Sequence, residues 1–161
     1  RMTTRPKLPN SPLPPLGLSQ DDLELVEAAR DVLRRHYQPF WHTVAAALRS
    51  SDGRIFTGVH LGATVGRLAI CAEAVALGRA VREGGLAPHD APGGPRLLTA
   101  VAVRHPKPEE DAREIAIVSP CGACREMITD YAPSAQVIVP GPDGGALKLP
   151  IATLLPLPYR R

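Results

Sequence analysis

Apolar side chains recur at the helical period just beyond a proline-rich beginning of the chain. Leu23, Val26 and Leu33 would share one face of a helix. Ser19 and the aspartate three positions later resemble a capping box, and Pro39 is a helix breaker. The pattern predicts an amphipathic helix that begins after Ser19 and ends before Pro39.

Short runs of β-branched and small apolar residues predict strands in five places. These are residues 42–48, 54–59, 96–103, 114–119 and 136–139. Ser51-Asp52-Gly53 is typical of a hairpin turn between the first two runs, and Asp143-Gly144-Gly145 indicates a later turn. The third and fourth runs alternate too little for half-exposed strands, so we expect them to be covered on both faces.

Two further helices are expected, at residues 70–83 and 121–131. The first ends at Gly84-Gly85, which suits a helix C-cap. Residues 61–68 and 84–95 contain glycines and prolines and are expected to be loops. This order of elements predicts an α/β fold in which a mixed sheet lies between helices and some parallel connections are made by crossover helices.

Length and composition narrow the class of protein. A chain of 161 residues suffices for one domain, expected at 19–161, while the five prolines of residues 1–18 predict a flexible tail. One Trp, three Tyr and two Phe with a net charge of +3 do not indicate a nucleic-acid-binding surface. The chain has no apolar run long enough for a membrane span and no apolar signal core, so we expect a cytoplasmic protein without a membrane partner.

All three cysteines fall in two short segments, which is the clearest chemical signal in the chain. Cys121 and Cys124 are three residues apart and would share one side of a helical turn, and Cys71 supplies a third sulfur. Zn²⁺ takes thiolates in tetrahedral geometry, and a catalytic zinc keeps one position open. Glu73, two residues after Cys71, is placed to handle the protons of a water molecule at that position.

Two other uses of these cysteines stay open. Cys121-Gly-Ala-Cys124 also resembles a thioredoxin-type redox pair, although Cys71 and Glu73 would then have no role. A purely structural zinc would require a fourth protein ligand. Three histidines are candidates for it: His60, His89 and His105.

The two cysteine segments resemble those of the zinc-dependent cytidine deaminases. In that family a Cys-x-Glu or His-x-Glu motif precedes Pro-Cys-x-x-Cys, and the glutamate is the acid/base rather than a ligand. The resemblance runs from about Thr43 to Leu155 and is strongest to the blasticidin S deaminase branch, at residues 51–59 and 119–122. It implies a three-layer α/β/α fold with a mixed central sheet. It also implies Zn²⁺ held by Cys71, Cys121 and Cys124, and a homotetramer with shared active sites.

The resemblance implies hydrolytic deamination of a cytosine-type nucleoside, such as cytidine, deoxycytidine or an analogue, with release of ammonia. Glu73 would be the catalytic residue that moves protons. One alternative is deamination of the antibiotic blasticidin S or of another aminated base, with poor activity on cytidine. A zinc-stabilised scaffold with the same fold is the non-enzymatic alternative, but a scaffold has no use for Glu73.

Substrate recognition is where the chain departs from its family. Cytidine deaminases usually carry Asn-x-Glu eleven residues before the first zinc cysteine, and the matching residues here are His60 and Gly62. A site without a partner for a ribose hydroxyl discriminates against it, so we expect cytidine to be a poor substrate or to be held differently. The residues predicted to contact substrate are Phe40, His42, Val44, His60 and Ala72.

Charge at the metal is a second departure. Many family members have an arginine directly after the catalytic glutamate, whereas this chain has Ala74. Arg125, which follows the last cysteine, is therefore the candidate for charge compensation at the metal.

Overall fold

The computed structural model describes residues 17–159, so nearly all of the predicted tail at 1–18 lies outside the described residues. The helices are α1 (Gln20–His36), α2 (Ala72–Gly84), α3 (Gly122–Tyr131) and α4 (Ile151–Leu154), with short 3₁₀ turns η1 (Gly66–Leu68) and η2 (Pro88–Asp90). The strands are β1 (Val44–Ser50), β2 (Ile55–Val59), β3 (Leu97–Arg104), β4 (Ala116–Val118), β5 (Gln136–Pro140) and β6 (Ala146–Pro150).

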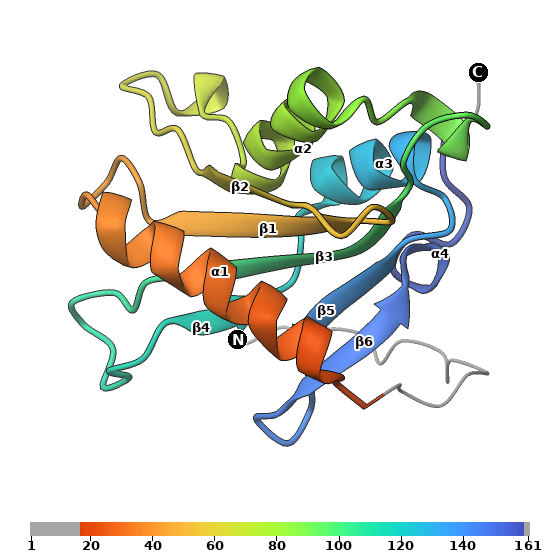
Figure 1. Cartoon of the computed structure of the whole chain (residues 1–161). Helices are drawn as coiled ribbons and strands as arrows, with labels where there is room; N and C mark the ends of the chain where they lie inside the picture. The colour runs from red at the N-terminus through yellow and green to blue at the C-terminus, as the bar shows by residue number, and fades with distance from the viewer. Residues whose placement is uncertain (1–16, 160–161) are drawn as a thin grey trace.

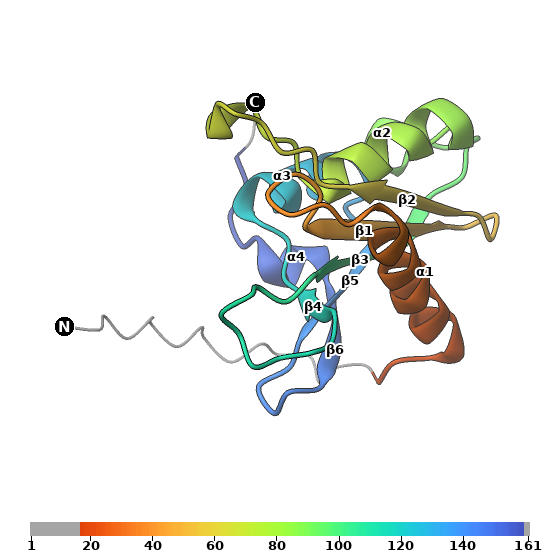
Figure 2. The same cartoon turned by 90° about the vertical axis from the view of Figure 1, so that its left-hand side faces the viewer.

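The strands form one mixed sheet between two layers of helices. Its order is β2-β1-β3-β5-β6, with β4 also paired to β3. Only β3 and β5 are parallel, and α3 lies on the connection between them. Figure 1 shows α1 on one face of the sheet and α2 and α3 on the other, and Figure 2 shows the same layers from the side. The predicted α/β/α fold is confirmed. Within residues 17–159 no helix is both long and apolar enough to cross a bilayer.

Strand β1 shows why the centre of the sheet is so apolar. Ala45 and Ala47 pack in the core beneath α1, whereas Ala46 and Leu48 pack in the core beneath α2 and α3. Both faces are therefore covered, and successive residues of one strand serve two separate cores. Small side chains on such a strand let helices approach from both sides.

A helix approaches the sheet very closely at Gly58 in β2. A β-carbon at this position would be 2.5 Å from the main-chain N of Ala76 and 2.7 Å from the carbonyl O of Ala72. Any side chain would force the first turn of α2 away from the sheet. Gly58 therefore determines the position of the N-terminus of α2, which carries Cys71.

Several predicted elements are confirmed with shifted ends. Strand β1 starts two residues later than predicted because His42 donates its main-chain N–H to the Gln38 carbonyl, closing a separate turn. Helix α2 starts at Ala72 rather than at Ile70, because Ile70 forms an isolated β-bridge with Leu61. The expected C-cap of α2 is present, with Gly85 at φ +74°.

The C-terminal part of the sheet departs further from expectation. The prediction that residues 114–119 form a strand covered on both faces is wrong. Strand β4 has three residues, which are exposed or half-buried, because β4 and β5 share one edge of β3. Strand β6 and helix α4 were not predicted. Strand β6 pairs antiparallel with β5 after the turn at Gly144, whose φ of +78° confirms that turn.

The predicted capping box at the start of α1 is present and is tied to β6. Asp22 accepts hydrogen bonds from the Ser19 main-chain N (2.8 Å) and hydroxyl (2.9 Å). Lys148 donates to both oxygens of the same buried carboxylate, at 2.8 and 3.1 Å. Burial raises the pKa of Asp22, but the bonds from Lys148 and Ser19 outweigh it and hold the pKa below its ordinary value.

Replacing Lys148 tests this link between α1 and β6. Lys148→Met keeps the aliphatic stem but leaves a buried carboxylate without its cation, so we expect the free energy of unfolding to fall by about 1–3 kcal/mol at pH 7. A group with a depressed folded pKa stabilises the protein above its unfolded pKa of about 4, and this contribution is lost as pH falls through the folded pKa. The difference between the two proteins in urea unfolding should therefore shrink over that acidic range.

Lys107→Met is the matched control, because the Lys107 ammonium makes no hydrogen bond or ion pair among residues 17–159 and is exposed. It should leave stability unchanged within about 0.5 kcal/mol. A loss for Lys148→Met that is the same at neutral and acidic pH would contradict the role given to the Asp22 pair.

Candidate metal centre and active site

The structure brings the three cysteines together. Their sulfur atoms all lie within 4.8 Å of one another, and the Sγ atoms of Cys71 and Cys121 are 3.6 Å apart. Tetrahedral zinc with Zn–S bonds of about 2.3 Å separates two sulfurs by about 3.8 Å. All three cysteines are free rather than disulfide-bonded. The sulfurs are thus spaced as ligands of one metal ion.

Two helix N-termini position these sulfurs. Cys71 and Cys121 occupy the N-cap positions of α2 and α3, with extended backbone at φ −64°, ψ 147° and φ −68°, ψ 170°. Cys124 lies in the first turn of α3 and is buried. Because Cys71 precedes the helical turn, it and Glu73 need not point in opposite directions as they would inside a helix. The positive ends of both helices favour negative charge on the sulfurs.

Glu73 is buried, with 7% of its surface exposed, in the first turn of α2. Burial raises the pKa of its carboxyl, while its own backbone N–H and the nearby Cys124 thiol lower it in part. No ion pair joins Glu73 to a cationic side chain in the described part of the chain.

Burial also shifts the pKa values of the three thiols. It raises the pKa of Cys71 and strongly raises the pKa of Cys124, where the negative charge of Glu73 raises it further. Burial also acts on Cys121, but hydrogen bonds from Cys124 and Cys71 outweigh it and lower the pKa of Cys121. A bound cation is usually the largest local charge and reverses such shifts. Three thiols and a carboxyl without a paired cation therefore fit a metal site.

The donor set fits Zn²⁺ with one position left open. Among residues 17–159 the group able to hold a metal consists of Cys71, Cys121 and Cys124 alone. The histidines considered as a fourth structural ligand are not part of it, and the His105 ring stacks on Tyr37 at 3.7 Å instead. Three protein ligands are typical of a catalytic zinc rather than of a structural one.

Arg125 is placed by main-chain acceptors. Its Nε donates to the Pro120 carbonyl at 3.0 Å, and its Nη1 donates to the Leu154 carbonyl at 3.0 Å. These bonds tie the segment that leads into Cys121 to the end of α4. Arg125 thus stabilises the position of the N-terminus of α3 by hydrogen bonds. Its role in charge compensation at the metal stays a prediction.

Three of the predicted substrate contacts lie side by side where β1 begins and β2 ends. His60 donates its main-chain N–H to the Val44 carbonyl at 2.8 Å, and His42 Nδ1 lies 2.8 Å from the His60 carbonyl. This contact makes Nδ1 the donor, which leaves Nε2 of a neutral His42 as an acceptor. The Nδ1 atom of His60 is buried without a partner among the described residues.

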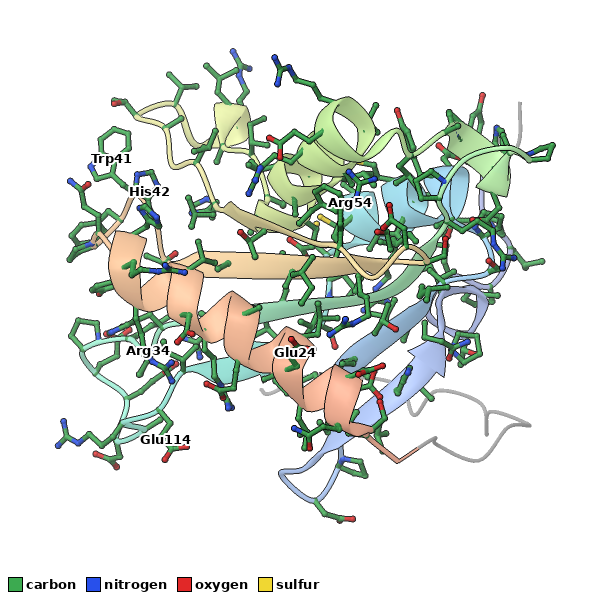
Figure 3. All side chains as sticks on the ribbon, in the orientation of Figure 1. Glu24, Arg34, Trp41, His42, Arg54 and Glu114 are labelled. Carbon is green, nitrogen blue, oxygen red and sulfur yellow. The ribbon has the colours of Figure 1, made fainter. Side chains whose placement is uncertain are left out.

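The other two predicted contacts differ sharply in exposure. Phe40 is 90% exposed and has a left-handed backbone, with φ +66°. Ala72 is fully buried, with its carbonyl O against Gly58. The structure therefore does not bring Ala72 to an accessible surface of this chain. Figure 3 shows Trp41 and His42 together at the end of the molecule that carries Phe40.

Gly62 has a role that sequence analysis missed. A β-carbon on Gly62 would lie 2.7 Å from the Phe40 carbonyl O and 2.9 Å from the Trp41 Cα. Its N–H binds the Trp41 carbonyl at 2.8 Å. The position that the family resemblance matches to a ribose-reading glutamate thus holds a backbone-to-backbone contact that leaves no room for a side chain.

Known proteins resemble this chain in sequence and in fold. A family model described as the cytidine and deoxycytidylate deaminase zinc-binding region matches residues 19–139. Blasticidin-S deaminase from Bacillus cereus is 44% identical over 90% of this chain and 96% of its own length. A probable cytidine deaminase from Dictyostelium discoideum is 30% identical over 86% of this chain and 84% of its own.

A crystal structure of cytidine deaminase from Burkholderia pseudomallei has the same fold. It is 26% identical, with a TM-score of 0.66, and the match covers 88% of this chain and all of that one. The chain belongs to the cytidine and deoxycytidylate deaminase family.

Proposed function

We propose that this protein is a zinc-dependent hydrolase that removes the amino group of a cytosine-type nucleoside, or of an analogue, and releases ammonia. The observation that carries the proposal is the convergence of three sulfurs from two helix N-termini beside one buried glutamate. The family match supports the same chemistry.

The chain's own residues account for the proton transfers. Zn²⁺ held by Cys71, Cys121 and Cys124 would lower the pKa of a water molecule at the open position towards about 7. Glu73 accepts a proton from the attacking water and passes it to the ring nitrogen. It then takes the proton of the hydroxyl formed on the ring carbon and passes it to the amino group, which leaves as ammonia. Its burial keeps bulk water from competing for those protons.

Blasticidin S is the second candidate substrate, and two observations favour it over cytidine. The Bacillus cereus relative at 44% identity is a blasticidin-S deaminase. The backbone packing at Gly62 also removes one of the two ribose-reading side chains usual in the family. A substrate with a different sugar would not leave a ribose hydroxyl without a partner.

We further propose that residues 19–161 form a single deaminase domain that assembles into homotetramers with shared active sites. Large apolar side chains gather on two neighbouring loops, a surface that a monomer rarely exposes. They are Phe40, Trp41, Leu61, Val65, Leu68 and Ile70. Free cysteines fit a reducing compartment, and we propose the cytoplasm.

Replacing Glu73 separates proton transfer from metal binding. Glu73→Gln should keep zinc at the wild-type level and reduce kcat by about 10²–10⁴-fold or more, because positioned acid/base transfer contributes that much. Zinc content by mass spectrometry and ammonia release should be measured on the same samples.

Glu83→Gln is the control on the same helix, since Glu83 is exposed and pairs with Arg79. It should retain full activity. Cys124→Ser should lose the metal and the activity together. A Glu73→Gln protein that lost zinc while its metallated fraction stayed active would show that Glu73 is not the acid/base.

A substrate panel tests recognition. We expect blasticidin S to be deaminated with a kcat/KM at least about tenfold above that of cytidine, deoxycytidine and free cytosine, because a buried hydroxyl without a partner costs about 1–3 kcal/mol. Rates should be followed by the loss of cytosine absorbance. Efficient turnover of cytidine with an ordinary KM would refute this preference.

Phe40 provides a test of the predicted substrate contact. Phe40 has a left-handed backbone and a ring that is 90% exposed, so glycine at this position relieves strain and loses little packing. The melting temperature of Phe40→Gly should therefore stay the same or rise. KM should nevertheless rise about tenfold, as for the loss of an aromatic contact, while Phe40→Tyr should restore it.

Leu157→Gly is a matched control, because Leu157 is also left-handed, at φ +59°, and is 97% exposed. It relieves the same kind of strain and should leave KM unchanged. Sedimentation of each variant separates loss of substrate contact from loss of assembly. If the Phe40→Gly protein is fully assembled and has the wild-type KM, Phe40 does not contact the substrate.

A further inference from the structure

A second hollow of chemical interest lies on the α1 side of the sheet, away from the cysteines. It has a volume of about 510 Å³, within the usual range of small-molecule sites. The C-terminal half of α1 forms one wall and the loop between β3 and β4 forms the other. Figure 3 labels Arg34 and Glu114 on these two walls. The lining residues are Arg30, Arg34, Tyr37, His105, Arg113, Glu114 and Ile115.

Three arginines line this hollow, and two of them are held in place by hydrogen bonds to neighbouring residues. Arg30 donates from Nη1 to the Glu27 carboxylate at 2.7 Å and from Nε to the Ile115 carbonyl at 3.3 Å. Arg34 donates from Nη1 to the Asp31 carboxylate at 2.6 Å, and the Glu27 carboxylate lies 3.5 Å from the same atom. Each bond occupies one edge of a guanidinium that has five donors, so these contacts orient the group and leave further N–H groups available.

The third arginine has no such partner. Arg113 makes no hydrogen bond or ion pair with any of residues 17–159. Glu114 is the one carboxylate that lines the hollow, while Glu27 and Asp31 hold the arginines from α1 itself. The other two arginines are already ion-paired along α1, so three carboxylates balance the three guanidinium groups in charge, and what the hollow offers is the unused N–H donors of arginines on two walls. A phosphate group, whose terminal oxygens accept several hydrogen bonds, fits such a set of donors better than a monocarboxylate, which one arginine would satisfy.

A stacked aromatic pair lines part of the hollow. The rings of Tyr37 and His105 lie 3.7 Å apart with an interplanar angle of 15°. The His105 main-chain N–H also donates to the Thr43 carbonyl at 3.0 Å. The hollow is thus tied to the segment 37–43, which carries Phe40 and His42.

We propose that this hollow binds the phosphate group of a small phosphorylated metabolite, at a site separate from the metal centre. The guanidinium groups of Arg34 and Arg113 bind the phosphate from opposite walls, and Arg30 adds a third cation. The Tyr37–His105 pair offers a flat edge for the remainder of the ligand.

Titration calorimetry on the zinc-loaded full-length protein tests the proposal, with inorganic phosphate, ribose 5-phosphate and uridine 5′-monophosphate as probes. Wild type should bind the phosphate esters with a Kd below about 1 mM. The double variant Arg34→Gln, Arg113→Gln should weaken this binding at least about 100-fold, because each charge-assisted contact is worth roughly tenfold or more. Uridine, which lacks the phosphate, should bind at least about tenfold more weakly than its monophosphate at this site.

Arg35→Gln is the control for the Arg34 change, since it removes one positive charge from the neighbouring position of the same helix but Arg35 does not line the hollow. It should leave the Kd within about twofold, as expected for a screened surface charge. Both arginine variants change exposed residues, and circular dichroism with thermal unfolding should show them folded. Binding that survives the double variant, equal loss with Arg35→Gln, or no binding by wild type at about 10 mM of any phosphate probe would overturn the proposal.

Discussion

The close approach of α2 to β2 is the constraint on which the site depends. At Gly58 the backbone of the strand lies against the first turn of the helix, with a β-carbon position only 2.5 Å from Ala76 N. Cys71 caps this turn and Glu73 lies within it, so both are positioned by one contact between backbones. A side chain at position 58 would displace a metal ligand and the proposed acid/base together. The geometry of the chemistry thus rests on the absence of a side chain.

The charge of the three sulfurs must also be balanced within the site. Two helix N-termini converge on the sulfurs, and the described residues offer no cationic side chain paired to Glu73. Arg125, the nearest candidate from the sequence, has two of its donors on main-chain carbonyls. The two helix ends and the metal itself supply positive charge at the sulfurs, and the contribution of Arg125 stays a prediction.

Local signals in the sequence predicted local structure well. Ser19 and Asp22 form the expected capping box, and Gly53 and Gly85 take the expected left-handed turns, because each depends on a few neighbouring residues. The meeting of Cys71 with Cys121 was inferred from a family motif, since spacing alone cannot bring distant segments together. Strand β6 was missed although it pairs with its sequence neighbour β5 across the predicted turn, whereas the truncation of β4 depends on how β4 and β5 share one edge of β3.

Substrate recognition is where we propose that this chain departs from its family. The loop from Leu61 packs its backbone directly on the turn at Phe40 and Trp41, which is why Gly62 has no side chain. That turn holds Phe40 at a positive φ, a cost of roughly 1–3 kcal/mol that packing within this chain does not recover, because the ring is almost fully exposed. Strain of this kind is frequent at ligand-binding sites, although Leu157 shows it as well without a proposed role. What distinguishes Phe40 is that its turn packs against Gly62 beside His42 and His60, and we therefore propose that this turn takes part in selecting the substrate.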